Sequence, residues 1–305
     1  MRRTLIAFVA VAALGAAAAV AFAASDASRS ASGGPIRVVA AENFWGSIAS
    51  QLGGSRVQVT SIVTNPATDP HDYEPTAVDA RTLAGAQLVI VNGIGYDPWA
   101  SKLLAANPVD GRIDLDVGDL VGLEPGANPH RWYSPADVQR VIGAIVADLV
   151  KLDPEHAASY RAQQARFETK GLARYKQLIA SIRRRYHGVP VGASESIFVP
   201  LARALRLDLL TPSSFLEAIS EGTDPTTGDI ATVDHQVARR QIRVWVLNGQ
   251  NSTPDVARIT DAARRKGIPV TTITETLSPP AATFEAWQAR QLEALAAALH
   301  RATGR

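Results

Sequence analysis

Cysteine is absent from this 305-residue sequence, and its absence excludes several kinds of structure at once. The chain can form no disulfide framework, no thiolate metal site and no cysteine nucleophile. Lipid attachment at an N-terminal cysteine is excluded for the same reason. The folded state must therefore be stabilised by an apolar core or by a bound ligand. The apolar content of 46% is ordinary for a globular protein.

An excess of charge of one sign is also missing. The formal net charge is only +2, and no run of lysine and arginine is interleaved with aromatic residues. We therefore expect no nucleic-acid partner. Neither a His-Glu-x-x-His nor a Gly-x-Ser-x-Gly motif occurs, so the sequence carries no motif of a zinc protease or of a serine hydrolase.

The N-terminal segment is typical of an export signal. Arg2 and Arg3 precede an apolar, uncharged stretch that ends in Ala-Phe-Ala, the small-x-small pattern of a cleavage site. We predict an export signal at residues 1–24 and a Ser/Gly/Ala-rich linker at residues 25–34. A retained membrane anchor is the alternative, because about 20 apolar residues span a bilayer. Under either interpretation the rest of the chain lies outside the cytoplasm, in the periplasm or outside the cell.

Segments of strand length alternate with segments of helical periodicity in two series. The first series has predicted strands at 36–40, 57–63 and 87–92 and predicted helices at 45–52 and 77–84. The second has predicted strands at 189–193, 244–247 and 268–273 and predicted helices at 197–205, 254–266 and 283–300. Such alternation predicts, in each series, a mostly parallel sheet covered by helices. The fold class is therefore α/β, with two lobes.

A long helical pattern separates the two series. It runs from about residue 156 to residue 186, just after a break at Asp153-Pro154. A helix of this length reaches about 45 Å, which suits a rigid connector better than a helix inside one small domain. We predict an N-terminal lobe at residues 35–153, a connecting helix at 154–187 and a C-terminal lobe at 188–305.

Two of the six histidines have the surroundings of a binding site. His71 and His130 each follow a proline, in loops between predicted core elements, and sites in α/β folds form at such loops. Glu195 directly follows the first strand of the second lobe, although an acid there can also simply interact with a helix dipole. Imidazole together with carboxylate suits zinc, manganese or ferrous iron. The remaining histidines are interpreted as surface residues: His156, His187, His235 and His300.

The surroundings of these three residues resemble the zinc/manganese-type (cluster A-I) solute-binding proteins of metal ABC importers. Asp-Pro-His-Asp-Tyr-Glu-Pro at residues 69–75 is similar to their first ligand motif. Asn-Pro-His-Arg-Trp-Tyr-Ser-Pro at 128–135 resembles the second. In the third motif a His or Glu heads an aromatic-bearing helix, as Glu195 does within residues 193–205. The resemblance covers nearly all of residues 36–300.

The resemblance implies a protein that captures metal and is not an enzyme. It implies two lobes joined by a rigid helix and one divalent ion, zinc or manganese, bound between them as cargo. His71, His130 and Glu195 would be the ligands. The partner would be the membrane permease of the importer, and we expect the protein itself to be a monomer without a catalytic cofactor.

The sequence departs from the family pattern at the fourth ligand. Many members supply an acid after the strand equivalent to residues 244–247, whereas here no acid occurs before Asp255. Gln250, Asn251, Ser252 or a water molecule would fill the place. No histidine-rich loop lies between His71 and His130, so the choice among zinc, manganese and iron stays open.

Two other functions remain as alternatives. One is a secreted zinc-dependent hydrolase, because two histidines and a glutamate with an open position are also the ligands of catalytic zinc. The other is an extracellular adhesion protein built on the same fold.

Overall fold

The computed structural model describes residues 34–305 apart from residues 67, 69 and 72. The predicted export signal, and the linker up to residue 33, lie outside the described residues. Residues 35–305 form one compact unit. In the part of the chain that the structure describes, no helix is both long enough and apolar enough to cross a membrane.

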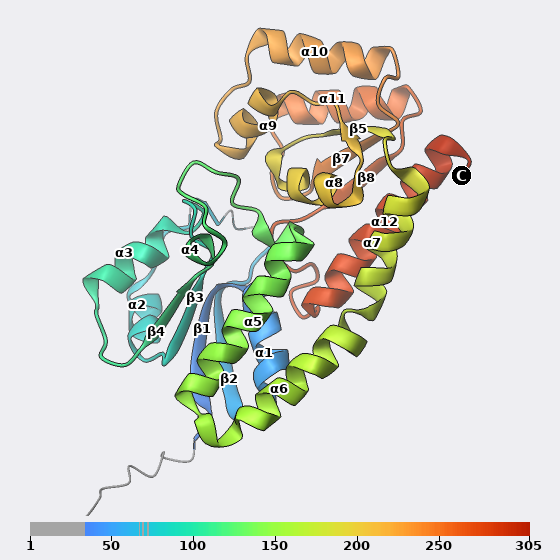
Figure 1. Cartoon of the computed structure of the whole chain (residues 1–305). Helices are drawn as coiled ribbons and strands as arrows, with labels where there is room; N and C mark the ends of the chain where they lie inside the picture. Colours follow the sequence, from blue (N-terminus) through green and yellow to red (C-terminus); the bar gives the residue numbers. More distant parts are fainter. Residues whose placement is uncertain (1–33, 67, 69, 72) are drawn as a thin grey trace, which may run out of the picture. The chain divides into compact units, whose positions relative to one another are not determined.

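The first lobe is built on a parallel sheet of four strands (Figure 1). The strands are β1 (Ile36–Glu42), β2 (Val57–Val63), β3 (Leu88–Val91) and β4 (Ile113–Asp116), in the order β2-β1-β3-β4. Its helices are α1 (Asn43–Gly53), α2 (Ala77–Ala84), α3 (Pro98–Ala106), α4 (Val117–Val121) and α5 (Pro135–Leu152). Strand β4 was not predicted from the sequence, because in Ile-Asp-Leu-Asp every second residue is charged and no apolar run marks the strand.

Alternate residues of the first sheet face two different apolar clusters, as the pleat of a strand requires. Val38 and Ala40 of β1 belong to the main core together with residues of α1 and α5. Val39 of the same strand belongs to a smaller cluster that includes Leu83 of α2 and Trp99 just inside α3. Helices therefore cover both faces of this sheet.

The second lobe repeats this plan with a second parallel sheet. The strands are β5 (Pro190–Ala193), β6 (Asp208–Leu209), β7 (Val244–Asn248) and β8 (Val270–Ile273), in the order β6-β5-β7-β8. The helices are α8 (Val199–Leu205), α9 (Ser213–Ser220), α10 (Thr227–Ala238), α11 (Pro254–Arg265) and α12 (Phe284–Thr303). The prediction of two α/β lobes is confirmed.

The strand order places a binding position at the same point of each sheet. In each lobe the first strand lies between the second and the third, so the chain moves away in opposite directions on either side of it. Ligands of open α/β sheets bind outside the carboxyl ends of the strands at such a reversal. We therefore expect binding residues in the segments that follow β1 and β3 in the first lobe and β5 and β7 in the second.

The connection between the lobes is helical but not one regular helix. It consists of α6 (Ala157–Arg166), a π-helical turn at Phe167–Gly171 and α7 (Ala173–Tyr186). Gly171 packs against the Phe167 ring, and a Cβ atom there would lie only 2.8 Å from it. The helical periodicity of the sequence could not reveal this local widening.

The two lobes share one core. A single cluster of buried apolar side chains contains residues from α1 and α5 of the first lobe, from α7, and from α8 and α12 of the second. Helix α12 lies along α7 (Figure 1). The backbone nitrogen of Leu277 also donates to Asn43 Oδ1 of α1, at 3.1 Å. Because apolar packing is continuous across the lobes, opening them would expose core surface.

Candidate metal centre

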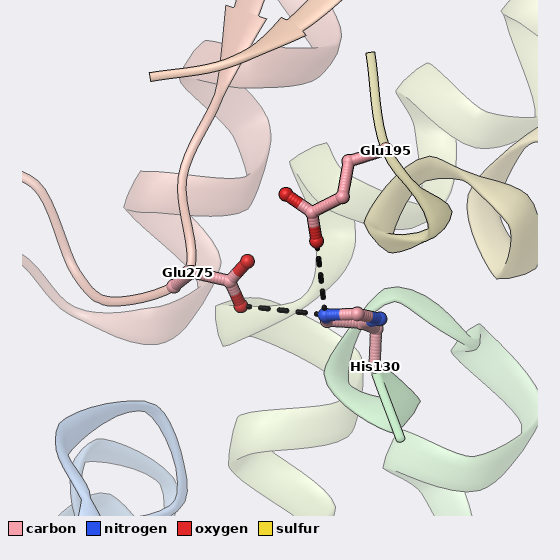
Figure 2. Close-up of side chains that lie close together, drawn as sticks. All are labelled: His130, Glu195 and Glu275. Carbon is pink, nitrogen blue, oxygen red and sulfur yellow. Dashed lines mark ion pairs between the residues drawn. The ribbon is translucent and has the colours of Figure 1, made fainter. Parts of the chain in front are cut away.

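One histidine and two glutamates meet between the two sheets. Single ligand atoms of His130, Glu195 and Glu275 lie within 4.8 Å of one another, and all three side chains are buried. His130 Nε2 is 3.5 Å from Glu195 Oε1 and 3.5 Å from Glu275 Oε2. Figure 2 shows both carboxylates directed at the same imidazole. The fold thus brings together two of the predicted ligands, His130 and Glu195, and adds Glu275.

The tautomer of His130 follows from its neighbour Asn128. Asn128 Nδ2 donates to the backbone oxygen of Ser196 at 2.8 Å, so Asn128 Oδ1 is the atom that faces the imidazole. That oxygen lies 3.0 Å from His130 Nδ1 and can only accept a hydrogen bond. The proton of the neutral imidazole is therefore on Nδ1, and Nε2 presents a lone pair to the carboxylates. A histidine that binds a metal ion is held in this way by a partner at its other nitrogen.

Glu195 is placed by the end of β5. The strand ends at Ala193, and the chain then enters a short 3-10 turn at Ser196–Phe198. Ser220 in α9 donates to Glu195 Oε1 at 3.3 Å, and Asn248 Nδ2 donates to Glu195 Oε2 at 2.5 Å. Asn248 ends β7, the strand beside β5, so the reversal of strand order explains why these two residues meet.

Glu275 was not singled out as a ligand in the sequence analysis. It lies two residues beyond β8, and its side chain reaches back to the cluster. Tyr96 donates its hydroxyl hydrogen to Glu275 Oε2 at 2.9 Å, and Asn248 Nδ2 donates to Glu275 Oε1 at 2.7 Å. The available signal was its place just after a predicted strand at residues 268–273, since acids at the carboxyl ends of parallel strands converge.

The two carboxyl groups make the cluster electrostatically unfavourable without a cation. Burial, followed by the nearby charge of Glu275, raises the pKa of Glu195 to about 8, even though His130 and the hydrogen bonds from Asn248 and Ser220 act in the opposite direction. Two like charges buried this close need a proton or a cation between them. At neutral pH the cluster therefore holds a proton that a metal ion could replace.

His71 lies beside this cluster, in the loop that follows β2. The centre of its ring is 6.1 Å from that of His130 and 4.6 Å from that of Tyr96. It is partly buried. His71 does not belong to the group whose ligand atoms lie within 4.8 Å of one another.

The residues expected to replace the fourth ligand make other hydrogen bonds. Gln250 Nε2 donates to the backbone oxygen of Pro66 at 2.5 Å, and Asn251 Nδ2 donates to that of Ile219 at 3.0 Å. Ser252 is exposed. The chain after β8, and not the loop after β7, therefore brings an acid, Glu275, to the cluster.

A cavity of about 660 Å³ lies next to the cluster. Its wall contains His71 and Asn128 from the first lobe and Ser196 and Ser220 from the second. Ser196 and Ser220 are hydrogen-bonded to each other at 3.0 Å, and Ser220 contacts Glu195 directly. The cavity therefore reaches the immediate surroundings of the candidate ligands.

The family described as "Zinc-uptake complex component A periplasmic" matches residues 38–298. The chain belongs to this family. The match includes both sheets, apart from the first two residues of β1, and all three residues of the buried cluster. The resemblance stated from the sequence motifs is thereby confirmed.

Several relatives of this member of the zinc-uptake component A family have names that mention a metal. The chain is 31% identical over 147 residues to the manganese-binding lipoprotein MntA of Halalkalibacterium halodurans, covering 46% of this chain and 47% of that protein. It is 31% identical over 170 residues to the iron-binding protein YfeA of Yersinia pestis, covering 51% and 52%. It is 26% identical over 265 residues to the metal ABC transporter substrate-binding lipoprotein FimA of Streptococcus parasanguinis, covering 81% and 82%. The first two matches span only about half of each relative.

Solved structures show the same fold. The cadmium-bound periplasmic metal-binding protein of Candidatus Liberibacter asiaticus has a TM-score of 0.72 at 20% identity, covering 87% of this chain and 99% of that chain. A crystal structure of ZnuA has a TM-score of 0.69 at 24% identity, with coverage of 87% and 99%. At these identities the likeness establishes the zinc-uptake component A fold.

Proposed function

We propose that this protein is the extracytoplasmic solute-binding component of a metal ABC importer. It captures a divalent ion, zinc or manganese, between its two lobes and delivers it to the membrane permease. The observation that carries this proposal is the buried cluster of His130, Glu195 and Glu275, whose ligand atoms lie within 4.8 Å of one another. Family membership and the names of the relatives support it.

The ligand set of the proposal is His71, His130, Glu195 and Glu275. Two neutral imidazoles and two carboxylates give the site a charge that a divalent cation neutralises. Removing two carboxylates from water is costly unless such a partner is present. The ring of His71 is already near that of His130, at 6.1 Å between centres, and a small movement of its loop completes the set.

These four side chains are suited to capturing a metal ion and not to catalysing a reaction. The proposal therefore assigns the protein no catalytic activity and no cofactor. Nothing among the described residues specifically favours the secreted hydrolase or the adhesion protein. Residues 1–24 would direct export, and residues 35–153 and 188–305 would be the lobes that hold the ion between them in a monomeric protein.

The proposal predicts that the buried cluster controls metal affinity. His130→Ala should weaken zinc and manganese binding more than 100-fold, because loss of even an outer-shell partner costs roughly 10–100-fold. Glu195→Gln and Glu275→Gln should weaken it less, since an amide oxygen remains. Isothermal titration of each ion into metal-stripped protein measures these affinities.

His235→Ala is the matched control, because His235 is exposed on α10 and far along the chain from the cluster. Its affinity should equal that of the unaltered protein. Wild-type affinity in the His130 variant, or no binding of either ion by the unaltered protein, would refute the proposal. The transport role is tested in a strain that lacks the gene and has lost metal uptake. If the unaltered gene does not restore uptake to this strain, the transport role is refuted.

A further inference from the structure

Asn248 touches both carboxylates of the cluster with one amide group. Its side chain is fully buried at the end of β7. Asn248 Nδ2 donates to Glu195 Oε2 at 2.5 Å and to Glu275 Oε1 at 2.7 Å. Asn248 Oδ1 accepts a hydrogen bond from the backbone nitrogen of Gln250 at 3.0 Å.

The orientation of this amide is determined by its partners. Carboxylate oxygens accept hydrogen bonds and a backbone N–H donates one, so Nδ2 must face the glutamates and Oδ1 must face Gln250. The amide nitrogen has two hydrogens, one for each carboxylate. The backbone nitrogen of Asn248 also donates to Ser194 Oγ at 2.9 Å, which holds the residue in register with β5.

Asn248 divides the four carboxylate oxygens into two kinds. The outer oxygens, Glu195 Oε2 and Glu275 Oε1, accept from Asn248. The inner oxygens, Glu195 Oε1 and Glu275 Oε2, each lie 3.5 Å from His130 Nε2 (Figure 2). The hydroxyl groups that contact the carboxylates do so at the inner oxygens. These are the hydroxyls of Ser220 and Tyr96.

We propose that Asn248 is a positioning residue that restricts each glutamate to one metal-binding oxygen and so raises the preference of the site for zinc over manganese. This inference rests on the proposed function. With one oxygen from each carboxylate and one nitrogen each from His130 and His71, the ion receives four donors. Four-coordinate tetrahedral sites suit zinc.

Manganese is disadvantaged by the same restriction. It prefers six oxygen-rich ligands in an octahedron, and in this site the simplest extra ligands are the outer carboxylate oxygens. Binding through both oxygens of a glutamate would require the carboxylate to turn its outer oxygen away from Asn248 and toward the ion, which would weaken that hydrogen bond. Weakening the hydrogen bonds of a buried amide is itself costly. Zinc already exceeds manganese in the usual order of affinities, and Asn248 widens that difference.

The inference is tested by Asn248→Ala and Asn248→Ser, with zinc and manganese affinities measured by chelator competition. Removing the amide frees the outer oxygens, so the ratio of zinc to manganese affinity should fall at least about tenfold in Asn248→Ala. Asn248→Ser, which keeps a single donor, should lie between this variant and the unaltered protein. Gln236→Ala is the control, because it removes another buried amide of the same lobe, one that donates to the Leu210 backbone oxygen.

X-ray absorption of the unaltered protein loaded with zinc gives a readout that needs no variant. It should show four nitrogen or oxygen donors, with one oxygen from each carboxylate. A five- or six-coordinate zinc, or equal loss of both affinities in the Asn248 variants, would overturn the inference. In both of these outcomes the unaltered protein still binds metal tightly through His130. They are therefore distinct from failure of the proposed function, in which the unaltered protein binds neither ion.

Discussion

At the scale of single residues, the properties of this protein depend on how carboxyl groups are held away from water. Glu195 is 1% exposed, and its pKa of about 8 results first from burial and then from Glu275. Glu42 and Asp97 form a second buried acid pair in the first lobe. Burial raises the pKa of Asp97 to about 6. Burial also raises the pKa of Glu42, and the nearby charge of Asp97 raises it as well.

A raised carboxyl pKa makes the metal-free protein less stable as pH rises. The folded state holds the Glu195 proton up to about pH 8, whereas an unfolded chain loses it near the ordinary value of 4.5. Between these values the folded state binds more protons, so the free energy of unfolding falls with pH. We expect the Tm of metal-free protein to decrease from pH 5 to pH 8.

Glu195→Gln should flatten this decrease, since an amide does not titrate, while Glu42 and Asp97 still contribute a slope of the same sign. Saturating zinc should reverse the trend, because the ion replaces the proton. Calorimetric scans at several pH values, with and without metal, measure the slopes. A metal-free variant as sensitive to pH as the unaltered protein would contradict this account of Glu195.

At the scale of elements, the short segment before α5 positions the imidazole. Ser134 caps α5 by accepting a hydrogen bond from the backbone nitrogen of Asp137 at 3.4 Å, and Asp137 forms an ion pair with Arg131. Asn128 connects the same segment to the second lobe through the Ser196 backbone oxygen. The segment is therefore anchored at both ends, with His130 between them.

The variants Asn128→Ala and Ser134→Ala should distinguish residues that position the His130 imidazole from residues that only stabilise the fold. Loss of Asn128 removes the partner of His130 Nδ1 and should weaken zinc binding roughly 10–100-fold. Loss of the cap at Ser134 should lower the free energy of unfolding by about 1 kcal/mol and leave zinc affinity unchanged. Zinc titration and urea unfolding of both variants give the comparison. The reverse pattern would show that Asn128 acts only on stability.

Elements with apolar runs were predictable from the sequence, and those defined by tertiary contacts were not. Val244–Asn248 and Leu88–Val91 are buried strands, and their apolar residues mark them clearly. The two-residue strand β6 begins with an exposed Asp208 and exists because it pairs with β5. In the π-helical turn at Phe167–Gly171 the backbone of Gly171 lies against the Phe167 ring, and the periodicity of the sequence does not encode such a local contact.

The candidate site divides in the same way. His130 and Glu195 stand in motifs with fixed spacing from a strand or a capped helix, so they could be recognised locally. Glu275 follows β8 in an unremarkable Thr-Glu-Thr sequence, and only the side-by-side placement of β5, β7 and β8 brings it to His130. The role of Asn248 depends on two partners, 53 and 27 residues away in the sequence.

At the scale of the whole molecule, the shared core limits how far the lobes can separate. The cluster of buried side chains runs without interruption from α1 and α5 through α7 to α12. Direct hydrogen bonds join the lobes as well, including that from Phe284 N to Ser47 Oγ at 2.9 Å and that from Tyr133 Oη to the Thr274 backbone oxygen at 2.9 Å. A wide opening would break these bonds and expose apolar surface.

We therefore expect metal binding to move loops near the site and not whole lobes. The radius of gyration from small-angle X-ray scattering should differ by less than about 1 Å between metal-free and zinc-loaded protein, the displacement common at pre-organised binding surfaces. The loops after β2 and β8, which supply His71 and Glu275, should instead gain protection in hydrogen exchange when zinc binds. The His130→Ala variant treated with zinc is the control, because its loops should gain no protection. A compaction of several ångströms on loading would mean that the continuous core opens in solution and that the lobes close on the ion as rigid bodies.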